Sequence, residues 1–297
     1  MRDLIIETSD LRRSFDGQTA LAGLDLQVPR GSIFGFLGRN GAGKTTTIRI
    51  LTGLLKKLGG SAAMFGEPLG PLGPPAEIRR RIGVVTEDKE LLPYMTFEQM
   101  IRFTRPFFPR WRPDLERRYL RMFDLPEDKN ITDLSKGMRA KLMLLLAMSR
   151  GAELLVLDEP MDGLDPVGVQ EVLREVVSMS ASEETTVFFS SHQLEEVEQI
   201  AEHVAIIDGG RSILNGALDD LKARFRRLQI VLPELIPIPS EWARDVEHVR
   251  QKGRTVSILA SRNVDDLMVK AHSLPGASVE VFPVGLKENF LDRVGSN

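Results

Sequence analysis

The chain has 297 residues, 42% of them apolar, which is ordinary for a globular protein with a buried core, and its length favours two domains. Its 39 basic and 42 acidic residues leave a net charge of −3, which disfavours a broadly basic nucleic-acid-binding surface, so no nucleic-acid partner is expected. The absence of cysteine excludes disulfides, thiol catalysis and thiolate metal sites.

Neither a secretory signal nor a membrane span is expected. The first ten residues carry Asp3 and Glu7 around a short apolar run, unlike the cationic and apolar regions of a signal peptide. The longest apolar stretch, 142–148, falls far below the roughly 18 residues that a membrane helix needs. If the protein works at a membrane, another chain must cross it.

The first half of the chain predicts a strand, a helix and then a helical region. The apolar run 32–37 is bounded by glycines, as a buried strand would be, and a helical pattern follows over 44–55. Residues 66–75 are rich in proline and glycine and predict a surface loop. An arginine-rich helical pattern over 96–123 is broken by prolines, and a further helix is expected over 135–150.

The next segments predict a parallel sheet. Two apolar runs, 154–157 and 186–189, are each followed by a polar turn and a helical pattern, which is the rhythm of βαβ units. The run 204–207 ends at Asp208-Gly209-Gly210 and predicts the last strand of this α/β unit.

The sequence changes in character after Asn215-Gly216. Short strands are expected over 255–259 and 279–282 around a helix over 264–273. We therefore interpret 217–297 as a small α+β domain, with the ferredoxin-like arrangement as one candidate.

A phosphate-binding loop stands between the first predicted buried strand and helix. Residues 38–45, Gly-Arg-Asn-Gly-Ala-Gly-Lys-Thr, match the pattern G-x-x-x-x-G-K-[ST]. Glycines let backbone N–H groups turn toward phosphates, and the helix N-terminus adds partial positive charge. Lys44 would reach the β- and γ-phosphates, and Thr45 would offer its hydroxyl to Mg²⁺. A glycine-rich turn without function is the alternative, and the strand-loop-helix context disfavours it.

Two carboxylates follow the predicted strand 154–157. Because the strand is buried, Asp158 and Glu159 emerge at its C-terminal end, the edge where parallel sheets bind ligands. Asp158 can hold Mg²⁺ through a water molecule, and Glu159 can act as general base on an attacking water. Acidic residues after a strand can also simply cap the next helix.

Three further segments point to a specific kind of phosphate-loop protein. Ser135 suits the N-cap of the helix over 135–150, and with Gly137 it would form a second anion site, so nucleotide would be shared between two copies. Gly163-Leu164-Asp165-Pro166 directly follows the carboxylate pair. His192 ends the strand over 186–189 on the same edge as Glu159, where it could contact the γ-phosphate.

In this order, these motifs resemble the nucleotide-binding subunit of an ATP-binding cassette (ABC) transporter, over residues 4–216. The resemblance implies a P-loop NTPase core of the RecA-like α/β kind, with a helical subdomain inserted at about 91–153. It gives an ABC ATPase domain at 1–216 and a C-terminal accessory or regulatory domain at 217–297. It also implies ATP and Mg²⁺ as cofactors.

The motifs and the resemblance together assign the site residues. Phe15 stands where the family usually places an aromatic residue that stacks on adenine, with core packing as an equally weighted alternative. The nucleotide-binding candidates are Phe15, Gly38, Arg39, Asn40, Gly41, Ala42, Gly43, Lys44, Thr45, Thr46, Ser135 and Gly137; the catalytic ones are Glu159, His192 and Lys44; and the metal ligands are Thr45, Asp158 and Glu87.

The partners also follow from the resemblance. The aromatic run 107–111 and the Leu-Ser-Lys-Gly-Met signature at 134–138 are similar to the branch that serves separately encoded exporter permeases. A permease and a second copy, or a homologous subunit, are therefore expected. The chain would be cytoplasmic and attached through the permease to the inner face of the cell membrane. The arginine-rich segment 102–121 would face the permease or anionic lipid, or would simply be a solvated surface.

The sequence departs from the family at two places. The signature reads Ser-Lys-Gly-Met rather than Ser-Gly-Gly-Gln, although Ser135 and Gly137 are kept. Glu87 stands where the family usually has a glutamine that binds Mg²⁺, and no glutamine lies between Gly83 and Leu92.

Two functions remain open at this point. The first is an ATPase in which two subunits close head to tail on two ATP molecules and open after hydrolysis. The second is an ATP-gated regulatory or binding module with little turnover, which Glu87 favours and which Glu159 and His192 disfavour. A cassette acting on DNA or ribosomes would call for long coiled-coil heptads or a tandem cassette, and neither is present.

Overall fold

The computed structural model describes residues 3–71, 73–88, 91–183, 185–235, 246–261 and 264–285. The contacts between residues divide the chain into two units, 1–215 and 216–297. Each unit has its own hydrophobic core and is described by itself.

A six-stranded sheet with the order β10-β9-β3-β8-β7-β6 forms the centre of the larger unit. Five of these strands pair in parallel, from β9 through β3, β8 and β7 to β6. All side chains of β3, β7 and β8 are buried, as expected for a parallel sheet covered on both faces. The strands are β3 (Ile33–Gly38), β6 (Ile82–Val85), β7 (Leu154–Asp158), β8 (Thr186–Ser191), β9 (His203–Asp208) and β10 (Arg211–Ala217).

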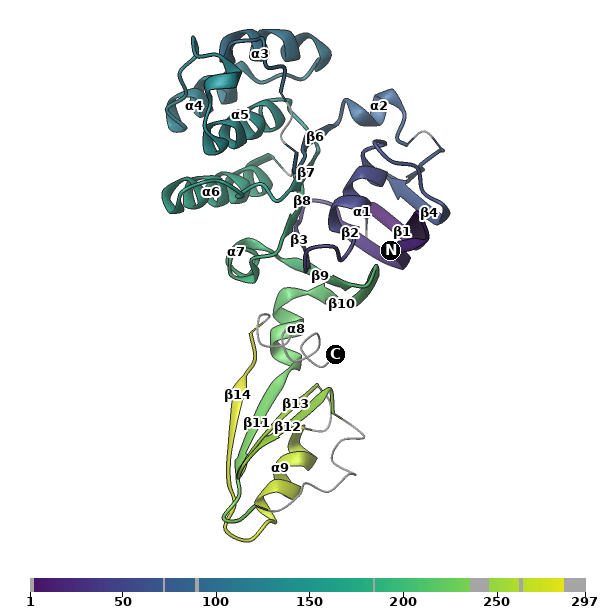
Figure 1. The fold of residues 1–297 in the computed structure, drawn as a ribbon, viewed down its shortest axis with the longest axis vertical. Coiled ribbons are helices and arrows are strands. Elements are labelled where there is room, and N and C mark those ends of the chain that lie inside the picture. Colours follow the sequence, from purple (N-terminus) through teal and green to yellow (C-terminus); the bar gives the residue numbers. More distant parts are fainter. Residues whose placement is uncertain are drawn as a thin grey trace. The chain divides into compact units, whose positions relative to one another are not determined.

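The two faces of this sheet are covered differently (Figure 1). Helix α1 (Lys44–Leu51) and an antiparallel sheet lie on one face, and α6 (Pro166–Glu183) and α7 (Leu194–Ile200) lie on the other. The antiparallel sheet has the order β2-β1-β4-β5. Its strands are β1 (Leu4–Phe15), β2 (Gln18–Pro29), β4 (Gly59–Met64) and β5 (Glu67–Pro68). One core cluster joins Leu24 of β2, Phe34 of β3 and Ile48 of α1, which fixes the phosphate loop between them.

A group of helices is inserted between β6 and β7. Thr96 begins the first of them with a capping box, because its hydroxyl accepts from the backbone of Gln99 while the Gln99 side chain accepts from the backbone of Thr96. The prolines at 106 and 113 separate the helices, as the sequence predicts. The inserted elements are α3 (Phe97–Thr104), η1 (Arg105–Phe107), α4 (Pro113–Met122), η2 (Ile131–Asp133) and α5 (Lys136–Met148); α2 (Ala76–Arg79) precedes β6.

Two predicted elements differ in extent. Helix α1 ends at Leu51 rather than at residue 55, because Gly53 adopts a left-handed conformation with φ +80° that stops the helix. The loop predicted at 66–75 contains the short strand β5, which pairs with β4 and so extends the antiparallel sheet.

The smaller unit is an antiparallel sheet with the order β12-β13-β11-β14, and α9 packs on one face of it. The predicted α+β character is confirmed, and the strand order is that of the ferredoxin-like arrangement as far as the described residues extend. The sequence analysis missed α8, β11 and β12, because none of them carries a long apolar run. The elements are α8 (Leu218–Arg224), β11 (Arg226–Val231), β12 (His248–Lys252), β13 (Thr255–Ala260), α9 (Val264–His272) and β14 (Ser278–Pro283).

Candidate nucleotide site

The phosphate-loop sequence connects β3 to α1 at the C-terminal edge of the parallel sheet. Gly43 has φ +111°, and a Cβ atom there would come within 2.8 Å of the Ala20 carbonyl oxygen, so the loop requires glycine at this position. A cavity of about 150 Å³ opens beside the loop. Its walls are Arg39, Asn40, Gly41, Gly43, Lys44, Thr45, Thr46, Glu87 and Glu159.

Lys44 is buried and holds its ammonium group inside the loop. Nζ donates to the carbonyl oxygen of Gly38 over 2.7 Å and lies 3.3 Å from Oε1 of Glu159. The lysine is therefore a fixed cation at the place where phosphates would lie.

The end of β7 carries the two predicted carboxylates. Asp158 is 1% exposed, and it accepts a 2.6 Å hydrogen bond from the hydroxyl of Ser190 on β8. That same hydroxyl accepts from the backbone N–H of Glu159. Glu159 adopts a left-handed backbone conformation with φ +46°, which turns its side chain toward the cavity.

His192 completes a row of three side chains. Its Nδ1 lies 2.9 Å from Oε2 of Glu159, while the other carboxylate oxygen of Glu159 faces Lys44. The structure thus brings together the three residues that the sequence assigns to catalysis, from the ends of two strands and the start of α1.

The predicted metal ligands also converge on this cavity. Thr45 donates through Oγ1 to Oε2 of Glu87 over 3.0 Å. Burial raises the pKa of Asp158, the hydrogen bond from Ser190 opposes the rise, and the charges of Glu87 and Glu159 add to it. Two carboxylates and a hydroxyl are hard oxygen donors of the type that Mg²⁺ prefers, so the donor set fits this ion. Among the described residues, no three acidic or histidine side chains are grouped to hold a metal ion by themselves, so phosphate oxygens and water would have to complete the coordination.

Ser135 and Gly137 lie away from this cavity, since neither is part of its wall. Ser135 caps α5 by accepting from the backbone N–H of Met138 over 3.2 Å. A Cβ atom on Gly137 would come within 2.7 Å of the Gly163 carbonyl oxygen, so the signature packs directly on the segment that follows Glu159. Within one chain, the signature does not join the phosphate loop.

Phe15 also lies outside the cavity wall. It ends β1, is 41% exposed, and stacks under the guanidinium of Arg13 at 4.6 Å. The core-packing alternative for Phe15 is therefore wrong.

The sequence analysis missed the role of Ser190. It pairs in register with Asp158 across the parallel strands β7 and β8, and it holds both members of the acidic pair. A polar residue at the end of a buried strand, level with the acidic pair, was the available signal.

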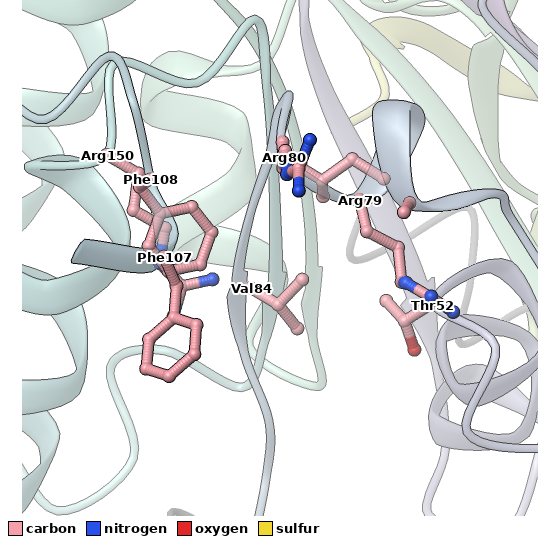
Figure 2. Close-up of a pocket in the computed structure, with 9 residues that line it drawn as sticks. Thr52, Arg79, Arg80, Val84, Phe107, Phe108 and Arg150 are labelled. Carbon is pink, nitrogen blue, oxygen red and sulfur yellow. The ribbon is translucent and has the colours of Figure 1, made fainter. Parts of the chain in front are cut away.

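A second cavity, of about 320 Å³, lies between α2 and the end of η1 (Figure 2). Arg79 ends α2 and Arg80 follows it; Phe107, which ends η1, and Phe108, which follows η1, face them. Arg150 stacks on the Phe108 ring at 4.1 Å, and burial lowers the pKa of its guanidinium to about 10. This second cavity, called the groove below, therefore has both aromatic and cationic side chains in its wall.

A phosphate loop ahead of a helix, with a buried carboxylate at the end of a neighbouring parallel strand, defines the nucleotide-binding site of a P-loop NTPase. The family model described as ABC transporter matches residues 21–162, and a model described as AAA domain, putative AbiEii toxin, Type IV TA system matches 127–198. The chain belongs to the ABC transporter family.

Relatives agree with this membership. The chain is 37% identical over 225 residues to the bacitracin transport ATP-binding protein BcrA of Bacillus licheniformis, covering 75% of this chain and 73% of that protein. It is 32% identical over 299 residues to the Nod factor export ATP-binding protein I of Cupriavidus pinatubonensis, covering 98% and 91%. The chain is therefore an ATP-binding subunit and ATPase of an ABC transporter, and it resembles the exporter type.

The fold of the chain also agrees with membership of the ABC transporter family. A solved dimeric bacterial ABC transporter cassette superposes with a TM-score of 0.65 at 18% identity, covering 72% of this chain and 98% of the cassette. Cassettes of this family form dimers and work as parts of transporters. Within the described part of the chain, no helix is both long and apolar enough to span a membrane.

Proposed function

We propose that this ATPase drives a separately encoded membrane permease that exports its substrate. The row Lys44–Glu159–His192 carries the hydrolytic part of the proposal, because it places a cation, a carboxylate and an imidazole beside the cavity. The relatives named for transport and export support the part that concerns the permease. The chain would lie on the inner face of the membrane, attached through the permease.

In this proposal the three residues divide the chemistry. Lys44 and the backbone N–H groups of the loop hold the phosphates. Glu159 takes the proton of the attacking water, and its left-handed backbone and the hydrogen bond from its N–H to Ser190 aim it. His192 keeps Glu159 oriented through the 2.9 Å contact and lies on the edge where the γ-phosphate would stand.

Thr45, Asp158 and Glu87 would hold Mg²⁺ together with the phosphates. When bound, the ion would neutralise charge on the phosphate oxygens. Ser190 keeps the buried Asp158 carboxylate in place, and Thr45 donates to Glu87 from the first turn of α1.

Two copies, or this chain and a homologous subunit, would close head to tail. Ser135 and Gly137 stand apart from the cavity of their own chain, so they are available to complete the site of a partner. Closing on ATP and opening after hydrolysis would transmit work to the permease.

The direction of transport is supported by relatives that are named for Nod factor export and for daunorubicin/doxorubicin resistance. The groove in Figure 2 suits a permease segment, because exposed Phe107 offers apolar surface and the exposed Arg79 and Arg80 offer charge to an acidic helix.

Affinity purification from membranes tests the proposal. The parent chain should retain a permease of several membrane spans, and Phe107→Glu should lose it while still binding ATP. Tyr94→Glu changes another exposed aromatic residue, one that does not line the groove, so it should retain the permease. Recovery of a nucleic acid or of a soluble complex, without a permease, contradicts the proposal.

A second candidate, an ATP-gated module with little turnover, is favoured by one observation: the carboxylate of Glu87 lines the phosphate cavity. The two candidates differ in turnover. Hydrolysis that stays near zero in the reconstituted complex would favour the module.

A further inference from the structure

The nucleotide cavity has an unusual balance of charge. Glu87 and Glu159 line it, and Asp158 lies behind it at the end of β7. The cations in its wall are Lys44, which is already paired with Glu159, and the exposed Arg39. His192 contacts Glu159 from the other side. Three carboxylates thus surround the place where a polyanion must bind.

Glu87 is held in this cavity by two contacts of its own loop. Its carboxylate accepts from the Thr45 hydroxyl over 3.0 Å, and the next residue, Asp88, forms a 2.6 Å ion pair with Arg49 on α1. Both contacts tie the segment after β6 to the first helix. A swing of Glu87 into solvent would have to break the Thr45 contact while Arg49 still holds its neighbour.

We propose that Glu87 makes nucleotide binding conditional on a divalent cation, so that the site admits metal-bound ATP and rejects the free nucleotide. This inference rests on the proposed nucleotide site. ATP without a metal carries about four negative charges, and a fixed carboxylate beside its γ-phosphate repels it. With a cation present, the same carboxylate becomes a hard oxygen ligand and attracts the complex.

A neutral amide at this position would act differently. It could still offer an oxygen to the metal, but it would not repel the free nucleotide. Glu87 therefore increases the ratio of the affinity for metal-bound ATP to the affinity for free ATP. Its carboxylate repels the free nucleotide and attracts the metal-bound one, so both effects contribute to the discrimination.

Equilibrium binding measures this ratio without reference to hydrolysis. Calorimetric titration with ATP would be performed with excess Mg²⁺ and again with EDTA, on the parent, Glu87→Gln and Glu202→Gln. The ratio of the dissociation constant in EDTA to that in Mg²⁺ should fall by about tenfold in Glu87→Gln, mainly because free ATP binds more tightly. Glu202→Gln removes the same charge from an exposed glutamate outside the cavity wall and should leave the ratio close to that of the parent.

Three outcomes overturn the inference. An unchanged ratio in Glu87→Gln means that Glu87 does not make nucleotide binding depend on the metal. An equal fall in Glu202→Gln means that general surface charge sets the ratio. If the parent does not bind Mg-ATP at all, the proposed nucleotide site fails, and the inference fails with it. A titration of Mg²⁺ at fixed ATP gives a second reading, in which Glu87→Gln should need more metal for half-maximal binding.

Discussion

The ammonium of Lys44 lies 3.3 Å from Oε1 of Glu159, so the fixed cation of the phosphate loop is paired with the carboxylate at the end of β7. Both side chains are largely buried, and Lys44 also donates to Gly38. A phosphate entering the cavity would compete with Glu159 for the same ammonium. Nucleotide binding would then release one oxygen of Glu159 while His192 still holds the other.

Lys44→Ala should abolish tight ATP binding. The change removes the buried cation of a site that must hold a triphosphate, where each charge-assisted hydrogen bond is worth about 1.5–3 kcal/mol. Calorimetry with Mg-ATP measures the effect. Lys56→Ala, at a lysine outside the cavity wall, is the control and should bind as the parent does. Equal affinity of Lys44→Ala and the parent contradicts the phosphate-loop assignment.

Glu159→Gln should preserve binding of ATP and Mg²⁺ but slow hydrolysis by about 10² to 10⁴, because an amide cannot act as general base. The variant should therefore accumulate as an ATP-bound dimer in gel filtration. Glu202→Gln makes the same substitution at an exposed glutamate of the same unit and should hydrolyse as the parent does. A monomeric Glu159→Gln variant with the parent's rate would show that Glu159 is not the base.

The sequence predicts most of the parallel sheet and the positions of the site residues, and both depend on local signals. The phosphate loop must follow a strand and precede a helix, and residues at the ends of parallel strands meet at one edge. This is why Lys44, Glu159 and His192 could be grouped before their distances were known. The roles of Glu159, His192 and Glu87 stay predictions.

Other features depend on contacts between distant parts of the chain. The pairing of β1 with β2 and β4, the hydrogen bonds of Ser190 to the acidic pair, and the reach of Glu87 to Thr45 over 42 residues in sequence cannot be read from a local pattern. Strand β12 reads His-Val-Arg-Gln-Lys and escaped notice because a strand with a single apolar residue is recognisable only through its partner.

Glu153→Gln should lower the stability of the larger unit at neutral pH by about 1 kcal/mol, since the carboxylate accepts two hydrogen bonds from Arg81 and one from Arg110. The Arg81 hydrogen bond, supported by that of Arg110, lowers the pKa of Glu153 below the ordinary range of a glutamate. The stabilisation is therefore fully present above about pH 4.5 and is lost as the pH falls through the lower folded-state pKa.

Urea unfolding of the parent and Glu153→Gln across this pH range checks the sign. The two curves should differ at pH 7 and converge in acid, whereas Glu202→Gln should track the parent throughout. A difference that grows as the pH falls would contradict the assigned role of the Arg81 and Arg110 contacts.

Ser135→Arg should block the nucleotide-dependent dimer without abolishing binding of ATP by the monomer. Ser135 starts α5 and does not line the cavity of its own chain, so a bulky cation there leaves the phosphate loop intact. In a head-to-tail dimer the same side chain would stand against the partner's nucleotide and would obstruct closure. Ser135→Ala removes the hydroxyl without adding bulk or charge; it should cost about 1 kcal/mol in helix stability and provides the matched control. Light scattering with Mg-ATP, performed in the Glu159→Gln background to prevent turnover, should find dimers for the control and monomers for Ser135→Arg. If both variants dimerise equally while ATP binding is unchanged, the nucleotide is not shared through the signature, and Ser135 serves only to begin its helix.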